Sequence, residues 1–176
     1  MAHGPGEKGD RLLLVGMMGS GKTTVGELAA QHLGWPHLDS DAEVEEATGQ
    51  TIPEIFAEQG EPAFRAAETE ALRRALDVEP AVVSVAGGAV LDAGNRRMLR
   101  DGGTVVWLRA EVATLAGRVG DGHGRPLLGG DPRQALGELE AVRRPLYAEV
   151  ADAVVDVDGH TPEEIAALAV GALGER

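Results

Sequence analysis

Short, mostly apolar runs alternate along the chain with longer stretches of helical pattern. Most of the runs are rich in leucine and valine, as is typical of strands that helices cover on both faces. They span residues 12–15, 36–39, 81–85, 104–108 and 153–157. Because strands that alternate with helices usually pair in parallel, the pattern predicts an α/β fold, with a five-stranded parallel sheet inside a three-layer α/β/α arrangement.

Glycine, proline and capping residues mark the ends of the helical stretches. Gly49 and Gly60 stop two short helices. Thr161-Pro162-Glu163-Glu164 has the spacing of a capping box with proline at the first helical position, and it opens the last helix. The other predicted helices cover residues 22–33, 41–48, 52–59, 62–76, 95–100, 111–119 and 132–150.

Residues 120–131 break this pattern. The segment holds five glycines and one proline, with Arg125 in its middle, and it predicts a mobile lid rather than a regular element. A lone arginine among glycines has no packing role there. It is well suited to a lid that carries positive charge to a phosphate.

The length of 176 residues indicates a single domain, which we place at residues 11–176 after a flexible polar leader over residues 1–10. The sequence has no cysteine, which excludes disulfides and thiolate metal sites. No apolar run approaches the ~20 residues that span a bilayer. We therefore expect a cytoplasmic protein, and we expect it to act as a monomer.

The formal net charge of −13 disfavours nucleic acid and anionic membranes as partners. It also means that any anionic substrate needs a local cluster of cations. Of the 16 basic residues only Lys8 and Lys22 are lysines, which leaves 14 arginines. Lys8 lies in the predicted leader, so Lys22 is the one lysine of the predicted domain.

Residues 16–23, Gly-Met-Met-Gly-Ser-Gly-Lys-Thr, fit the pattern G-x-x-x-x-G-K-[ST] between a predicted strand and a predicted helix. Glycines let backbone N–H groups surround phosphate oxygens, and the helix N-terminus adds partial positive charge. The lysine reaches the β- and γ-phosphates, and the threonine hydroxyl can bind Mg²⁺. The pattern therefore predicts an ATP site made by Gly19, Ser20, Gly21, Lys22, Thr23 and Thr24.

A small-metabolite kinase fits this site best. A guanine-reading Asn-Lys-x-Asp segment is excluded, because lysine occurs only at positions 8 and 22.

Leu38-Asp39-Ser40-Asp41 ends the second strand, whose carboxyl end lies beside the phosphate loop in a parallel sheet. One carboxylate there can hold Mg²⁺ through water, and the other can orient the acceptor hydroxyl. Alternatively, Ser40 or Asp41 simply caps the next helix.

Six segments together resemble the shikimate kinase family. They are the loop over residues 16–23, Leu38-Asp39-Ser40-Asp41, Phe64-Arg65-x-x-Glu68, Gly87-Gly88, Arg125-Pro126-Leu127-Leu128 and Arg143-x-Pro145-Leu146-Tyr147. Their order and spacing match the family over about residues 12–173. The resemblance implies a P-loop fold like that of the nucleoside monophosphate kinases. It also implies transfer of the γ-phosphoryl group of ATP, with Mg²⁺, to the 3-hydroxyl of shikimate.

The resemblance further implies a role for each matching residue. Asp41 would bind the acceptor and act as the catalytic base, with Lys22 and Arg125 stabilising the transferred group. Asp39 would hold Mg²⁺ through water beside Thr23, with Ser84 nearby. The shikimate site would be formed by Arg65, Gly87, Gly88 and Arg143, and the adenine would lie between Arg118 and Pro162.

Spacing alone favours plainer interpretations at two positions. Arg65 and Glu68 would form a surface ion pair, and Arg143 with Arg144 would form a solvated basic patch. Ala86 stands where the family usually has glycine, which bears on the choice of acceptor. Two alternative functions remain: a P-loop kinase for gluconate or a related polyol acid, and a non-catalytic module that only binds ATP.

Overall fold

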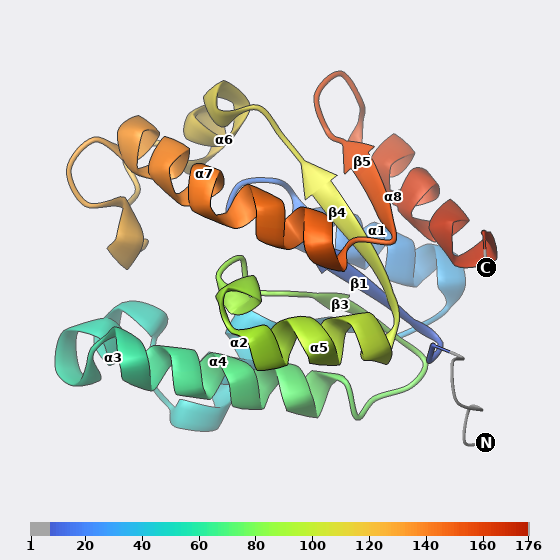
Figure 1. Ribbon diagram of the computed structural model, residues 1–176, viewed down its shortest axis with the longest axis horizontal. Helices are drawn as coiled ribbons and strands as arrows, with labels where there is room; N and C mark the ends of the chain where they lie inside the picture. The colour runs from blue at the N-terminus through green and yellow to red at the C-terminus, as the bar shows by residue number, and fades with distance from the viewer. Residues whose placement is uncertain (1–7, 176) are drawn as a thin grey trace.

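A five-stranded parallel sheet forms the centre of the computed structural model, which describes residues 8–175 (Figure 1). Its order is β2-β3-β1-β4-β5, and every neighbouring pair is parallel. The predicted sheet is therefore confirmed. The strands are β1 (Arg11–Val15), β2 (His37–Asp39), β3 (Ala81–Ser84), β4 (Thr104–Arg109) and β5 (Ala153–Asp156).

Helices cover both faces of the sheet. They are α1 (Lys22–Leu33), α2 (Ser40–Thr48), α3 (Ile52–Gln59), α4 (Glu61–Ala75), α5 (Ala93–Gly102), α6 (Val112–Val119), α7 (Pro132–Val150) and α8 (Pro162–Gly171). Helices α1 and α8 pack together on one face, while α4, α5 and α7 cover the other (Figure 1). Helix α6 packs on α7, and α2 and α3 pack on α4. The three-layer α/β/α arrangement is thus confirmed.

Two hydrophobic clusters hold these elements together. The larger cluster surrounds the sheet, where residues 12–14 of β1 are fully buried. Burying such side chains is the main favourable contribution to folding. A separate, smaller cluster lies among α2, α3 and α4, and it consists of Val44, Ile55, Phe64 and Ala71. The helices that carry Asp41 and Arg65 therefore have a small core of their own.

The predicted capping box at the start of α8 is present. Thr161 Oγ1 accepts a hydrogen bond from the backbone N–H of Glu164 at 3.2 Å, and the Glu164 carboxylate accepts one from the N–H of Thr161 at 2.9 Å. The same device joins Thr51 and Glu54 at the start of α3, with a spacing that is equally visible in the sequence.

The predicted lid over residues 120–131 contains one short element. Residues 8–175 contain three 3₁₀ turns: η1 (Ala89–Leu91) after β3, η2 (Pro126–Leu128) inside the lid, and η3 (Ala172–Gly174) after α8. The expectation of no regular structure is therefore wrong at η2. Leu128 is only 3% exposed and belongs to the larger cluster, so its burial fixes this turn. Mobility of the lid stays a prediction.

Residues 1–7 of the predicted leader lie outside the described residues. Lys8, near the end of the predicted leader, binds the Asp152 carboxylate, with Nζ 2.6 Å from both oxygens. Within residues 8–175 no helix is long and apolar enough to cross a membrane.

Candidate active site

The phosphate loop joins β1 to α1 at the carboxyl edge of the sheet. Gly19 and Gly21 have left-handed backbone conformations, with φ of 82° and 94°, which residues with a Cβ rarely adopt. Among the described residues no side chain caps the first turn of α1. Its N–H groups and the positive end of the helix dipole are thus left for a ligand, and a phosphate suits both.

Lys22 lies over this loop. Its Nζ donates to the carbonyl oxygens of Gly16 at 2.7 Å and Met17 at 3.0 Å. Burial lowers the pKa of Lys22 to about 8, and Asp41 and Asp39 counteract this effect. At neutral pH Lys22 is therefore mostly protonated, and its positive charge lies where the phosphates would bind.

Asp39 connects the phosphate-loop helix to α2. One carboxylate oxygen accepts a hydrogen bond from Thr23 Oγ1 at 2.8 Å. The other accepts from the N–H groups of Asp41 at 2.9 Å and Ala42 at 3.2 Å. The expected alternative is therefore wrong in detail, because Asp39 caps α2 rather than Ser40 or Asp41. Capping also fixes the Asp39 carboxylate beside Thr23.

Ser84, at the end of β3, takes part in a network that spacing does not indicate. Its Oγ donates to the backbone carbonyl oxygen of Lys22 at 2.7 Å and lies 2.8 Å from His37 Nε2. Because a carbonyl oxygen only accepts, His37 must be the donor to the Ser84 hydroxyl. The network fixes the first turn of α1. His37 and Ser84 are 47 positions apart, so only the pairing of β2 with β3 brings them together.

Asp41 lines a cavity of about 400 Å³ beside the phosphate loop. Burial and the neighbouring Asp39 raise the pKa of the Asp41 carboxyl, while Lys22 and Arg125 oppose the rise. A carboxyl group with a raised pKa in a cavity is suited to accepting a proton. The predicted site residues in the lining are Gly19, Gly21, Lys22, Thr23, Thr24, Asp39, Asp41, Gly87, Gly88, Arg125 and Arg143.

Four predicted site residues, Ser20, Arg65, Arg118 and Pro162, lie outside this lining. Ser20 is buried within the loop, and Pro162 is the first residue of α8. Arg118 lies on α6, and its Nη1 donates to the carbonyl oxygen of Gly19 at 3.0 Å. Arg118 is thus placed at the phosphate loop, whereas its contact and that of Pro162 with adenine stay predictions.

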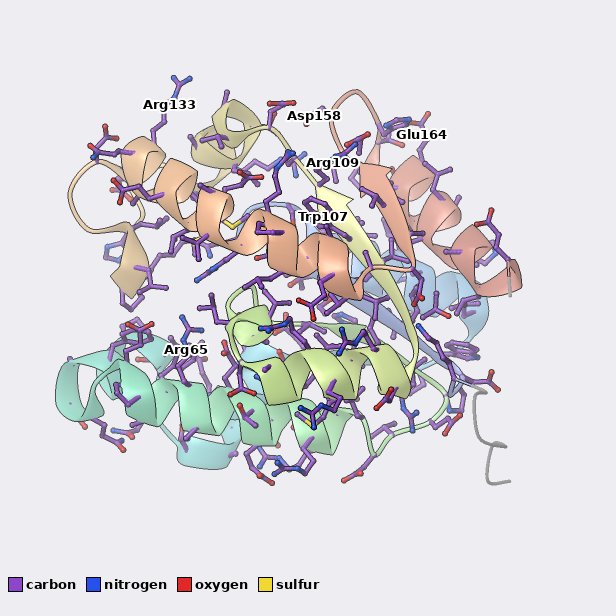
Figure 2. The ribbon with its side chains drawn as sticks, in the orientation of Figure 1. Arg65, Trp107, Arg109, Arg133, Asp158 and Glu164 are labelled. Atoms are coloured by element: carbon purple, nitrogen blue, oxygen red, sulfur yellow. The ribbon has the colours of Figure 1, made fainter. Side chains whose placement is uncertain are left out.

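The Arg65 guanidinium lies next to the backbone of Gly88, and the buried carboxylate of Glu68 holds it there. Its Nη1 donates to both oxygens of Glu68, at 3.0 and 3.1 Å, and its Nη2 donates to Glu61 at 3.2 Å. Glu68 is 2% exposed, so the expected surface ion pair is wrong. Burial raises the pKa of Glu68 to about 7, and Arg65 opposes that rise. Figure 2 shows Arg65 pointing from α4 toward the side of the molecule where the lid lies.

Gly88→Ala is expected to lower kcat/KM for the acceptor roughly tenfold or more, because it displaces Arg65, which is predicted to bind the acceptor, and small displacements of a binding group are costly. A Cβ at this position would lie 2.1 Å from Arg65 Nη1 and 2.8 Å from its Cζ, so the guanidinium must move. Steady-state kinetics with the acceptor varied check this. The matched control is Gly137→Ala in α7, where a Cβ has open space and kinetics should not change. Unchanged acceptor kinetics in Gly88→Ala would contradict the expectation.

Arg143 is buried, so the solvated basic patch expected from spacing is wrong. It is 1% exposed, and in the described part of the chain its Nε has no hydrogen-bond partner. Arg144 is exposed instead and donates to Glu140 at 2.7 Å. One turn after Arg143, the Tyr147 hydroxyl donates to the Gly87 carbonyl oxygen at 2.7 Å. A buried guanidinium with an unused donor is typical of a site that a ligand completes.

Ala86 leaves the cavity open. It is 5% exposed, and its N–H donates to Ser40 Oγ at 2.8 Å. Among the described residues the lining passes from Val85 to Gly87 without it. The methyl group of Ala86, where the resemblance leads one to expect glycine, therefore does not line this cavity.

The cations in and beside this cavity suit two anions. The phosphate loop and Lys22 suit a nucleotide phosphate, while Arg143 and the nearby Arg65 suit the negative charge of a second molecule. Asp41 lies in the same cavity, where it can accept a proton. The fold and the site therefore define a P-loop phosphotransferase for a small anionic acceptor.

Comparison with known proteins identifies the family. A protein-family model described as shikimate kinase matches residues 18–173. A shikimate kinase of Rhodococcus jostii is 45% identical over 94% of this chain and 98% of its own length. One of Streptomyces avermitilis is 47% identical over 93% of this chain and 95% of its own length. A solved structure of shikimate kinase from Acinetobacter baumannii in complex with shikimate is 40% identical, with a TM-score of 0.87 over 90% of this chain and 89% of that chain.

The chain belongs to the shikimate kinase family. The family identified from the sequence is thereby confirmed, and with it the enzyme class of ATP-dependent kinase and the P-loop fold.

Proposed function

We propose that the chain transfers the γ-phosphoryl group of ATP to the 3-hydroxyl group of shikimate. The observation that carries the proposal is that Lys22, Asp41, Arg125 and Arg143 line one cavity at the phosphate loop. Phosphoryl transfer to an anion needs cations at the point where two negative molecules meet. The acceptor is inferred from the family and from the A. baumannii relative, whose structure holds shikimate.

The phosphate half of the site would bind the β- and γ-phosphates. Backbone N–H groups of the loop and the ammonium group of Lys22 would hold them in place. Arg125, exposed on the lid and lining the cavity, would place a second cation on the phosphoryl group during transfer. Closure of residues 120–131 would exclude water, which otherwise competes as the acceptor.

Thr23 and Asp39 fit Mg²⁺, the cofactor that the family implies. Hydroxyl and carboxylate oxygens are the donors that Mg²⁺ prefers, and here they lie 2.8 Å apart. In the described part of the chain no three His, Cys, Asp or Glu side chains are grouped to hold a metal. Thr23 would therefore share it with the nucleotide phosphates, and Asp39 would contact it through water. When bound, the ion neutralises phosphate charge.

The acceptor half would bind and activate shikimate. Arg65 and Arg143 would hold its carboxylate through their planar guanidinium groups, with Gly87 and Gly88 beside it. Asp41 would orient the 3-hydroxyl and take its proton as the oxygen bonds to the γ-phosphorus. The bond between that phosphorus and the bridging oxygen of ADP would break in the same transfer.

An acceptor panel tests this proposal. The purified protein is given ATP and Mg²⁺ with shikimate, gluconate or related hydroxy acids, and ADP release is followed by a coupled assay. We expect ADP release that depends on shikimate, with one phosphate transferred per shikimate consumed. Turnover of gluconate without turnover of shikimate would overturn the acceptor. Absence of acceptor-dependent ADP release with every compound would favour an ATP-binding module. The cytoplasmic location and the monomeric state stay predictions from the sequence.

A further inference from the structure

Helix α6 begins without a capping side chain of its own. Its N-cap residue, Glu111, makes no capping hydrogen bond within the described structure. Asp158, on the loop between β5 and α8, acts in its place. The Asp158 carboxylate accepts from the N–H of Glu111 at 2.9 Å and from the hydroxyl of Thr114. Figure 2 shows Asp158 between α6 and that loop, so one carboxylate joins two segments that are 44 to 47 positions apart.

The other end of α6 lies against the phosphate loop. A Cβ at Gly19 would come within 3.1 Å of Val119 Cγ1 and 3.3 Å of the Leu115 carbonyl oxygen, so loop and helix are in close contact. Arg118 adds its hydrogen bond to the Gly19 carbonyl oxygen at 3.0 Å. Helix α6 is thus held at its start by Asp158 and near its end by the phosphate loop.

The loop that carries Asp158 is itself ordered. The N–H of His160 donates to the Val157 carbonyl oxygen at 3.3 Å, and His160 Nδ1 lies 3.0 Å from the Asp156 carbonyl oxygen. The capping box at Thr161 then fixes Pro162 at the start of α8. These hydrogen bonds tie His160, just before the start of α8, to the residues just before Asp158. We therefore expect a shift of Asp158 to move Pro162 as well.

We propose that Asp158 is a positioning residue of the adenine subsite. By capping α6 from the loop before α8, it would set the distance between Arg118 and Pro162, the two residues that the resemblance to shikimate kinases implies on either side of the adenine. This inference rests on the proposed function, because it takes ATP as the phosphoryl donor.

The charge of Asp158 suits this task. An anion at a helix N-terminus interacts favourably with the helix dipole. The hydrogen bonds from Thr114 and Glu111 lower the pKa of Asp158, and the positive charge of Arg118 lowers it further. Asp158 is therefore ionised throughout the neutral range, so the cap does not weaken with moderate changes in pH.

Asp158→Ala tests the proposal through two ligands that share the phosphate site, ADP and pyrophosphate. Titration calorimetry should show roughly a tenfold loss of ADP affinity, with pyrophosphate affinity and KM for shikimate unchanged. The matched control is Asp152→Ala at the start of β5. The Asp152 carboxylate also accepts a backbone N–H across 47 positions, that of Val105 at 2.8 Å, but it touches no part of α6 in the described structure. It should leave ADP affinity unchanged.

Thr114→Val removes one of the two hydrogen bonds and keeps the side-chain shape. It should lower ADP affinity by a smaller factor. The double variant should bind ADP no more weakly than Asp158→Ala alone, because both substitutions act through one contact. Thr114→Val also carries the test if Asp158→Ala does not fold. Equal losses of ADP and pyrophosphate, a similar ADP loss in Asp152→Ala, or additive effects in the double variant would each overturn the proposal.

The same series separates this inference from the proposed function. Shikimate-dependent ADP release by the unchanged protein is measured alongside the binding experiments. If that activity is present and Asp158→Ala binds ADP normally, the positioning role fails and the function stands. If the unchanged protein lacks the activity, the proposed function fails whatever the variants bind.

Discussion

Asp41→Asn is expected to lower turnover with shikimate about a hundredfold or more while ADP affinity stays near that of the unchanged protein. Asparagine has the shape of aspartate but cannot take a proton from the acceptor hydroxyl. Burial and Asp39 both disfavour the charged form of Asp41, so losing that charge should not lower the thermal midpoint of unfolding. Steady-state kinetics with shikimate varied, together with an ADP titration, check the expectation.

The pH profile distinguishes a catalytic base from a binding group. Asp41 must be deprotonated to act, and its pKa is raised, so kcat/KM for shikimate should fall as pH drops through a value above the ordinary aspartate range. That acid limb should be missing from the residual activity of Asp41→Asn. Glu43→Gln, on the same helix but outside the cavity lining, is the control and should keep full turnover. Turnover that survives in Asp41→Asn would remove Asp41 from the role of base.

Arg65→Ala is expected to raise KM for shikimate on the order of a hundredfold, with KM for ATP little changed. The variant removes a guanidinium that Glu68 holds beside Gly88, a residue of the proposed acceptor site, through two hydrogen bonds of 3.0 and 3.1 Å. Arg65→Lys should lie between the two, because lysine keeps the charge and loses the planar fork. Initial rates over a grid of both substrate concentrations measure the two KM values separately.

A second variant keeps this test independent of folding. Without Arg65, Glu68 is a buried carboxylate without its partner, which costs about 3–5 kcal/mol if it stays charged. Its pKa is already raised to about 7, so Glu68 would take up a proton in Arg65→Ala. Arg65→Ala with Glu68→Gln removes the charge altogether. A KM for shikimate that returns to normal in this double variant would mean that Arg65 acts only by stabilising α4.

The sequence predicts most of this fold because its local signals agree with one another. The alternation of strands with helices and the capping box at Thr161 are set by residues close together in the chain, and sequence patterns show such local features directly. What they do not record is contact between distant segments. Leu128 has the same local surroundings as a loop residue, yet it is buried against the core and gives the lid its 3₁₀ turn. The sequence places the N-cap of α2 at Ser40 or Asp41 rather than at Asp39. Local pattern cannot choose among these three residues, because all are good N-cap types.

The candidate site divides in the same way. The phosphate loop is predictable, because its spacing alone dictates its backbone shape. Spacing wrongly predicts that Arg65–Glu68 and Arg143 are exposed to solvent. Charged residues on a helix have the same spacing whether that face of the helix meets water or packs against another element. Only the packed structure makes Glu68 and Arg143 buried. The link from His37 through Ser84 to Lys22 is likewise created by strand pairing.

The separate small core of α2, α3 and α4 has an evolutionary consequence. Val44, Ile55, Phe64 and Ala71 form this small core, whereas Leu72 and Ala75 near the end of α4 belong to the larger cluster around the sheet. Side chains of the small core can therefore vary with less effect on the sheet than those of Leu72 and Ala75. Arg143 reaches the same pocket from α7, outside those three helices. Changes within the small core would therefore leave Arg143, the proposed partner of the acceptor carboxylate, in place. New acceptors that retain a carboxylate would be easier to acquire than acceptors without one.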